Sequence, residues 1–174
     1  MKGADGVTAA WLKSERLVLD PLRVEHADDL APVLNDSALH DFIGGVPMDV
    51  AQLRARFERQ VRGRSPDGHK RWLNWTVREL AAGKAVGTVQ ATVTGHPPTA
   101  SAELAWVIGR AHQGRGFAQE AVGLMVSWLR ERGIRRLGAH IHPRHHASMA
   151  VARSISLAPT DVIVDGERRW ELSA

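Results

Sequence analysis

A glycine-rich turn between a predicted strand and a predicted helix limits what this chain can fold into more than any other feature. The turn reads Gln113-Gly114-Arg115-Gly116-Phe117-Ala118. Glycines at 114 and 116 let the backbone approach a ligand closely, because they carry no side chain. The helix that follows would point its free N–H groups and the positive end of its dipole at that ligand. The turn therefore predicts an anion site that suits a pyrophosphate.

Two better-known phosphate motifs do not fit this turn. A dinucleotide-binding fold would have a third glycine and an early strand–helix–strand unit, whereas this turn comes late in the chain. A P-loop would continue with Gly-Lys and then Ser or Thr, which are absent here. The sequence therefore predicts a phosphate site of another kind.

The hydrophobic pattern predicts strands and helices on both sides of the turn. Apolar runs, several of them alternating, predict strands over 15–22, 72–79, 85–94, 102–108 and 136–142, and a closing hairpin over 159–172. Apolar residues at helical spacing predict helices over 24–36, 49–62, 116–132 and 147–154. This order of elements predicts an α+β, or mixed α/β, sheet domain.

The composition predicts one globular domain. The chain has 174 residues, of which 44% are hydrophobic and 24% are charged, and it contains no cysteine. A chain of this length buries about 70% of its unfolded surface, so it needs neither a disulfide nor a structural metal. We expect a flexible leader over 1–14 and the domain over 15–174.

Charge and hydropathy restrict the partners and the compartment. The formal net charge of +4 favours anionic partners, and a phosphate-rich small molecule would satisfy it as well as a nucleic acid would. The first residues lack the apolar region of a secretory signal, and no stretch reaches the roughly 18 apolar residues of a membrane span. With the absence of disulfides, this predicts a cytoplasmic protein that does not enter membranes.

The turn and its neighbours resemble the GNAT acetyltransferases. Their phosphate-binding motif is Gln or Arg, two residues, Gly, one residue, then Gly or Ala, and Gln113, Gly116 and Ala118 fit it. The stretch from Glu103 to Ala121 is similar to the branch that includes the ribosomal-protein N-terminal acetyltransferases. The resemblance implies a mostly antiparallel sheet of about six or seven strands with splayed fourth and fifth strands, flanked by about four helices.

The resemblance also implies that acetyl-CoA is the co-substrate, with its pantetheine inserted between 102–108 and 136–142. The residues that would bind it are Trp106, Val107, Ile108, Gln113, Gly114, Arg115, Gly116, Phe117, Ala118, His145 and Ser148. The branch usually has an Asn near His145, a Ser that matches Ser148, and a Gly-Phe pair near 156–157. This chain keeps only the serine.

Acetyl transfer to an amine requires a base, an oxyanion donor and an acid. Glu103 is the predicted base, because it lies on the strand beside the presumed thioester; the alternative is an ordinary ion pair. The family takes the oxyanion donor from the backbone of that strand, here around 106–108. Many relatives use a tyrosine as the acid, but this chain has none, so Ser148 or water is predicted instead. A hydrogen bond within its own helix is the other role open to Ser148.

The acceptor site has weaker signals in the sequence. Trp72, Asn74 and Trp75 lie on the strand that borders the acceptor cleft in relatives, and Phe42 lies in the loop between the first two helices. Core packing is the more common role of a Trp. The arginines of the helix over 49–62 form a solvated face or contact an acidic acceptor or RNA.

A histidine cluster offers a metal-binding alternative. His140 and His142 would share one face of a strand, and His145 and His146 follow closely. No cysteine joins them, and no carboxylate stands nearby at ligand spacing, so we expect no metal. Lining of the cleft or relay of a proton is the favoured role.

The favoured interpretation is an acetyl-CoA-dependent N-acetyltransferase that acts by direct attack in a ternary complex. Its partners would be coenzyme A and a primary amine, on a peptide N-terminus or a small molecule, and a homodimer is compatible with the sequence. A catalytically idle CoA-binding sensor or scaffold is the alternative. A basic nucleic-acid-binding domain is disfavoured, because no recognition-helix or RNA-binding signature accompanies the charge.

Overall fold

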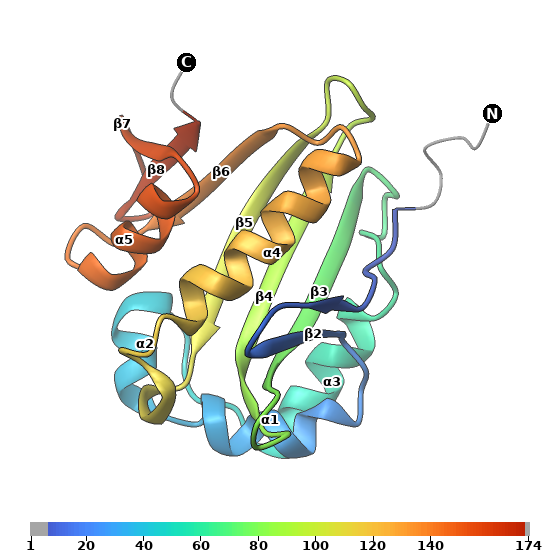
Figure 1. The fold of residues 1–174 in the computed structure, drawn as a ribbon, viewed down its shortest axis with the longest axis vertical. Coiled ribbons are helices and arrows are strands. Elements are labelled where there is room, and N and C mark those ends of the chain that lie inside the picture. The colour runs from blue at the N-terminus through green and yellow to red at the C-terminus, as the bar shows by residue number, and fades with distance from the viewer. Residues whose placement is uncertain (1–6, 173–174) are drawn as a thin grey trace.

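The computed structural model of the protein describes residues 7–172, which form one eight-stranded sheet (Figure 1). The strands are β1 (Leu12–Lys13), β2 (Leu17–Pro21), β3 (Lys70–Glu79), β4 (Ala85–Thr94), β5 (Ser101–Ile108), β6 (Arg136–Ile141), β7 (Leu157–Val164) and β8 (Glu167–Leu172). Their order in the sheet is β1-β2-β3-β4-β5-β6-β8-β7. Of the described neighbours, only β5 and β6 run parallel, which confirms the mixed, mostly antiparallel prediction.

The described residues also form five α-helices, one more than predicted. They are α1 (His26–Leu34), α2 (Ser37–Ile43), α3 (Val50–Gln60), α4 (Phe117–Glu131) and α5 (His146–Ser154), with a short 3-10 helix, η2 (Arg110–His112), before the glycine-rich turn. The sequence pattern predicts a loop where α2 lies. Asp36 caps it by accepting a hydrogen bond from the N–H of Ala38 at 2.9 Å.

Helix α4 covers one face of the sheet and builds the main core. Figure 1 shows it lying over the sheet, roughly along β4 and β5, and its buried stripe is Phe117, Ala121, Val122, Met125, Val126, Trp128 and Leu129. Opposite that stripe lie alternate residues of β2 and β3: Leu17, Leu19, Leu73, Trp75 and Val77. Complete burial of one such side chain is worth about 1.5–3 kcal/mol. Helices α1 and α3 form a second, smaller core with Ala85 of β4.

The predicted leader contributes to the main core in its described part. Leu12 of β1 pairs with Leu19 of β2. The indole N–H of Trp75 donates to the carbonyl oxygen of Ala10 at 2.8 Å. The two-residue strand β1 also raises the strand count to eight, beyond the six or seven that the resemblance implied.

The sheet opens between β5 and β6. In the described strands these two pair at Ser101–Arg136, Ala102–Leu137 and Glu103–Gly138, and the pairing ends there. Beyond Glu103, β5 continues along β4, whereas β6 continues along β8. The two strands therefore diverge, as Figure 1 shows, and this confirms the predicted splay of 102–108 and 136–142.

A buried polar cluster joins α1 to β2 and β3. Asp20 is 2% exposed and His26 is 1% exposed. The Nδ1 atom of His26 lies 3.3 Å from the backbone N of Arg23 and 2.8 Å from the hydroxyl of Thr76. Because a backbone N–H can only donate, Nδ1 must be unprotonated. The ring is therefore neutral, with its proton on Nε2, 3.3 Å from the Asp20 carboxylate that Arg78 already neutralises.

Acidification should destabilise the fold through His26. Burial lowers the pKa of His26 from its ordinary value near 6.5. Between that value and the lowered pKa, His26 is protonated in the unfolded chain but not in the folded protein. The free energy of unfolding should therefore fall as the pH drops from about 6.5, until the ring of the folded protein is also protonated. Urea denaturation at pH 7.5 and 5.5 should show the loss. His26→Gln should reduce it, and replacement of the exposed His69 should not; an equal loss in His26→Gln would contradict the assignment.

Candidate active site

Two cavities meet where β5 and β6 diverge. The first, about 660 Å³ and here named the turn cavity, lies between the glycine-rich turn, the end of β5 and α5. The second, about 600 Å³ and here named the sheet cavity, lies over β3, β4 and β5 under α3 and the segment after α2. The residues that line both are Phe42, Ile43, Trp106, Val107, His145 and Ser148. The two cavities therefore adjoin along these side chains.

The glycine-rich turn forms the floor of the turn cavity. Gly114 and Gly116 have φ angles of +76° and +79°, in the left-handed region, which costs another residue about 1–2 kcal/mol. Gly116 is also the N-cap of α4, whose first N–H groups have no acceptor inside the helix. The side chain of Gln113 turns back and donates to the carbonyl oxygen of Ile108 at 2.9 Å. It therefore fixes the turn to the end of β5.

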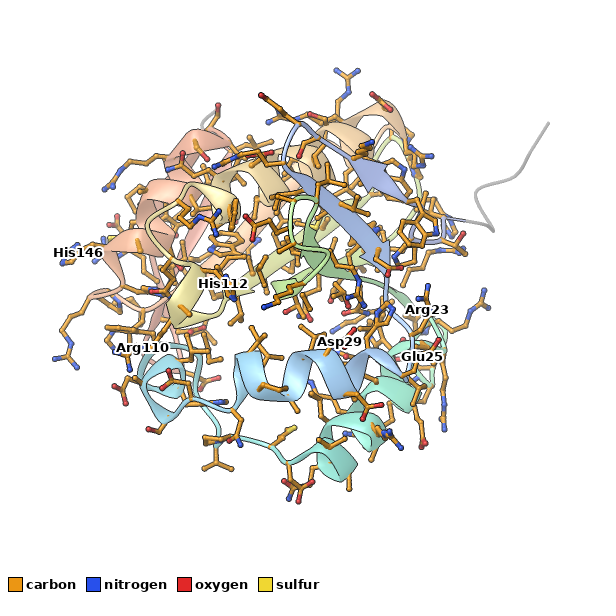
Figure 2. The ribbon with its side chains drawn as sticks, turned by 60° about the horizontal axis from the view of Figure 1, so that its bottom comes forward. Arg23, Glu25, Asp29, Arg110, His112 and His146 are labelled. Carbon is orange, nitrogen blue, oxygen red and sulfur yellow. The ribbon has the colours of Figure 1, made fainter. Side chains whose placement is uncertain are left out.

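Basic side chains line the same cavity. They are Arg110, His112, Arg144 and His146. Figure 2 shows Arg110, His112 and His146 on one side of the molecule, away from Arg23, Glu25 and Asp29. Arg110 also pairs with Asp36, the N-cap residue of α2, at 3.5 Å. Arg110, His112 and Arg144 are not among the predicted site residues, although their proximity to the turn and to α5 in the sequence is a usable signal.

Arg115 lies on the outer side of the turn. Its guanidinium forms an ion pair with Glu79 and lies 4.4 Å from the ring centre of Phe117. The hydrogen bond from Arg115 lowers the pKa of Glu79. Of the residues predicted to bind the cofactor, Arg115 is absent from the described walls of both cavities, whereas Phe117 and Ala118 line the turn cavity.

Ser148 and His145 stand at the junction of the cavities. The indole N–H of Trp106 donates to the hydroxyl oxygen of Ser148 at 3.2 Å. The His145 ring stacks on Phe42 with a centroid distance of 4.6 Å and an interplanar angle of 9°. Burial, and secondarily the nearby His142, lowers the pKa of His145, which favours a neutral ring. The structure thus brings together residues that the sequence placed on a strand, a helix and a loop.

Glu103 faces the sheet cavity in a network of charged groups. One carboxylate oxygen, Oε1, accepts from the guanidinium of Arg169 at 2.8 Å. The other, Oε2, lies 3.7 Å from Nδ1 of His140 and has no hydrogen-bond partner among the described residues. The hydrogen bond with Glu103, followed by that with Glu171, raises the pKa of Arg169. Arg169 is therefore a fixed positive charge behind Glu103.

Gly138 makes this network possible. A Cβ atom at position 138 would lie 2.7 Å from Nη2 of Arg169 and 3.1 Å from Oε1 of Glu103. The Arg169 side chain therefore crosses β6 where a side chain is missing. Arg169 could not be predicted from the sequence, because only the register of β5, β6 and β8 brings it beside Glu103.

The predicted acceptor residues have different surroundings. Asn74 lines the sheet cavity beside its cross-strand partner Gln90, and Phe42 lines both cavities. Trp75 reaches the wall of the sheet cavity, but it is 0% exposed and packs edge-on against Trp128 in the main core. Trp72 is half-buried and is absent from the described walls.

Residues 7–172 contain neither a metal-binding group of side chains nor a helix that could span a membrane. No three His, Cys, Asp or Glu side chains in that range are grouped to hold a metal ion, although His140, His142 and His145 line the sheet cavity. In the same range, every helix is too short or too polar to cross a bilayer.

Comparisons with known proteins agree with this geometry. A family model described as an acetyltransferase (GNAT) domain matches residues 16–157. An uncharacterized N-acetyltransferase p20 of Bacillus licheniformis is 26% identical over 159 residues, which cover 90% of this chain and 87% of that protein.

Two solved structures share the fold over most of both chains. The microcin C7 self-immunity acetyltransferase MccE, in complex with acetyl-CoA and AMP, superposes with a TM-score of 0.73 at 14% identity, over 91% of this chain and 92% of that chain. RimL, a ribosomal L7/L12 alpha-N-protein acetyltransferase in complex with coenzyme A, has a TM-score of 0.72 at 17% identity, over 93% and 97%. The family match spans most of the sequence and contains both the turn and the splayed strands. The chain belongs to the GNAT acetyltransferase family.

Proposed function

We propose that this protein is an acetyl-CoA-dependent N-acetyltransferase that transfers an acetyl group to a primary amine by direct attack in a ternary complex. The observation that carries the proposal is the meeting of the two cavities at the splay, where Trp106, Val107 and Ser148 face both. Direct transfer requires both substrates to be bound at once with their reacting atoms in contact. Two cavities that adjoin at the same side chains support this proposal, because each could hold one substrate near the other.

The residues of the turn cavity fit the phosphates of coenzyme A. The free N–H groups of α4 and the positive end of its dipole suit a pyrophosphate. Nothing lies within 4 Å of the position that a Cβ of Gly114 would take, so the backbone there is open to close approach. Arg110, His112, Arg144 and His146 would attract the negative charge. When bound, acetyl-CoA would supply the activated thioester, and its reacting end would lie near Trp106 and Ser148.

Glu103 would remove the proton of the amine through His140. Arg169 pairs with Oε1 of Glu103, and Oε2 is a buried atom 3.7 Å from Nδ1 of His140. His140 lines the sheet cavity together with Glu103, so its ring could accept a proton from an amine in that cavity. A proton taken by His140 would create an imidazolium that the Glu103 carboxylate stabilises. In this proposal Glu103 keeps the base role predicted from the sequence, but acts on the amine through His140.

Ser148 would donate a proton to the departing thiolate. The indole of Trp106 can only donate a hydrogen bond, so the Ser148 oxygen accepts it and the hydroxyl hydrogen stays available. The backbone N–H groups of 106–108 would hold the oxyanion, as in the family. Ser148 is 8% exposed and lines both cavities, which suits transfer at their junction.

Acetyl-CoA should stabilise the protein and release its thiol when a suitable amine is present. A ligand at about 100 times its Kd adds about 2.7 kcal/mol to the free energy of unfolding. For a domain of this size that corresponds to a rise in Tm of roughly 5–10 °C. Thermal denaturation would test binding, and a thiol assay with a panel of amines and peptides, followed by mass spectrometry of the products, would test transfer.

The outcomes separate the proposal from its alternative. A rise in Tm together with thiol release and a product heavier by one acetyl group would support the transferase. Stabilisation without transfer to any amine would instead identify a CoA-binding module without catalysis. No stabilisation and no transfer would remove both.

A further inference from the structure

Arg56 is a positive charge in the wall of the sheet cavity. Helix α3 begins with a capping box, in which Asp49 and Gln52 exchange hydrogen bonds, and this fixes the start of the helix. The residues of α3 that line the cavity follow the spacing of one helical face: Leu53, Arg56, Phe57 and Gln60. Leu53 and Phe57 are buried, so they anchor this face against the second core and turn Arg56 toward the cavity.

Arg56 differs from its neighbour Arg54. The guanidinium of Arg54 pairs with Asp28 at 2.7 Å on the outer surface. Arg56 has no ion-pair or hydrogen-bond partner in the range 7–172. Desolvation, and secondarily the charge of Arg59, lowers the pKa of Arg56. Arg56 is exposed to solvent, and a guanidinium keeps its proton in a protein, so among the described residues no partner neutralises this positive charge.

The other charged groups in the wall of the sheet cavity do not neutralise Arg56. The carboxylates in its wall are Glu103, which Arg169 holds, and Glu167 on β8. Neither forms an ion pair with Arg56 in the described part of the chain. Neutral amide groups of Asn74 and Gln90 lie in the wall as well. The cavity thus has a proton acceptor at the splay and a free guanidinium on α3.

We propose that Arg56 binds an anionic group of the acceptor, so that the substrate is an amine that also carries a carboxylate or a similar anion. This inference rests on the proposed function and specifies its substrate class. A guanidinium binds a carboxylate through two parallel hydrogen bonds, which fix orientation as well as charge. The amine would then face His140 and Glu103 while the anion faces α3. A cavity of about 600 Å³ suits a small molecule or the end of a peptide.

Matched pairs of acceptors test the inference. Each pair consists of an amino acid and its carboxamide, and the set varies the distance between the amine and the carboxylate. The wild-type protein should prefer the carboxylate member of at least one pair about 10-fold or more in kcat/KM, because a hydrogen bond to a charged group is worth about 1.5–3 kcal/mol. In Arg56→Gln this ratio should fall toward one, mainly through a higher KM for the carboxylate.

Arg54→Gln is the control, because it removes a guanidinium from the same helix outside the cavity. It should keep the preference, and both variants should keep the stabilisation by acetyl-CoA. A wild-type protein that acetylates carboxamides as well as carboxylates in every pair would overturn the inference but not the proposed function. The same holds if Arg56→Gln retains the preference. Absence of transfer to every acceptor would remove the proposed function, and this inference with it.

Discussion

Replacement of Glu103 by Gln should lower kcat for acyl transfer by about 100-fold or more, since general acid–base catalysis contributes roughly 10²–10⁴. Gln keeps the size of the side chain but cannot stabilise a protonated His140. The loss should be largest at low pH, where an amine with a pKa near 8–10 is almost entirely protonated and depends most on a base. Initial rates from pH 6 to 9.5 would measure it. Stabilisation by acetyl-CoA should persist, because Glu103 lines the sheet cavity and not the turn cavity.

Glu171→Gln is the matched control for this substitution. Glu171 pairs with the same guanidinium of Arg169, yet it is absent from the described wall of the sheet cavity. It therefore removes one ion pair of the network without removing the carboxylate beside His140. We expect kcat within a few-fold of the wild-type value. An equal loss of kcat in both variants would mean that the effect comes from the ion pairs with Arg169 and not from the loss of the carboxylate beside His140. An unchanged kcat in Glu103→Gln would exclude the proposed role of Glu103.

The fold could be predicted where its elements are long and periodic. The stripe from Ala118 to Leu129 identifies α4, and alternating or apolar runs identify the strands. Helix α2 was missed because seven residues give too few turns for a periodic pattern, and its one clear cue was the cap at Asp36. Strand β1 was missed because two residues show no alternation; its pairing with β2 depends on tertiary structure.

The site could be predicted where a local motif defines it. The turn from Gln113 to Ala118 lines the turn cavity at most of its positions, because the motif is a property of consecutive backbone units. Side-chain direction was not predictable in the same way. Arg115 points outward to Glu79, a residue of β3, and Trp75 packs inward against Trp128 of α4. Both directions depend on elements far along the chain.

The network of charged groups around Glu103 also depends on contacts between elements far apart in the sequence. Its members lie on β5, β6 and β8, and they become neighbours because Glu103 pairs with Gly138 and His140 pairs with Arg169. A shift of either register by one residue would move one partner to the opposite face of the sheet. The sequence identified Glu103 and the histidines as chemically suitable groups. It held no signal for the arginine that fixes Glu103 or for the glycine that gives that arginine room.

Gly116→Trp should abolish the stabilisation by acetyl-CoA and the transfer that depends on it. Gly116 lies in the wall of the turn cavity at the start of α4, and an indole there would separate a pyrophosphate from the free N–H groups of the helix. Its Cβ would also lie 3.4 Å from Nη2 of Arg16, which pairs with Glu120 of the same helix. The expected result is loss of the entire ligand-dependent rise in Tm, measured by thermal denaturation with and without acetyl-CoA.

Gly83→Trp separates loss of binding from loss of stability. Gly83 has a φ of +63° and lies outside both described cavity walls, with nothing within 4 Å of its Cβ position. Both substitutions place a bulky residue in the left-handed region, so each should cost about 1–2 kcal/mol in the free energy of unfolding. Only Gly116→Trp should also lose the response to the ligand. A full rise in Tm in Gly116→Trp would mean that the pyrophosphate binds elsewhere, and the turn would then lose the role on which the assignment of both cavities depends.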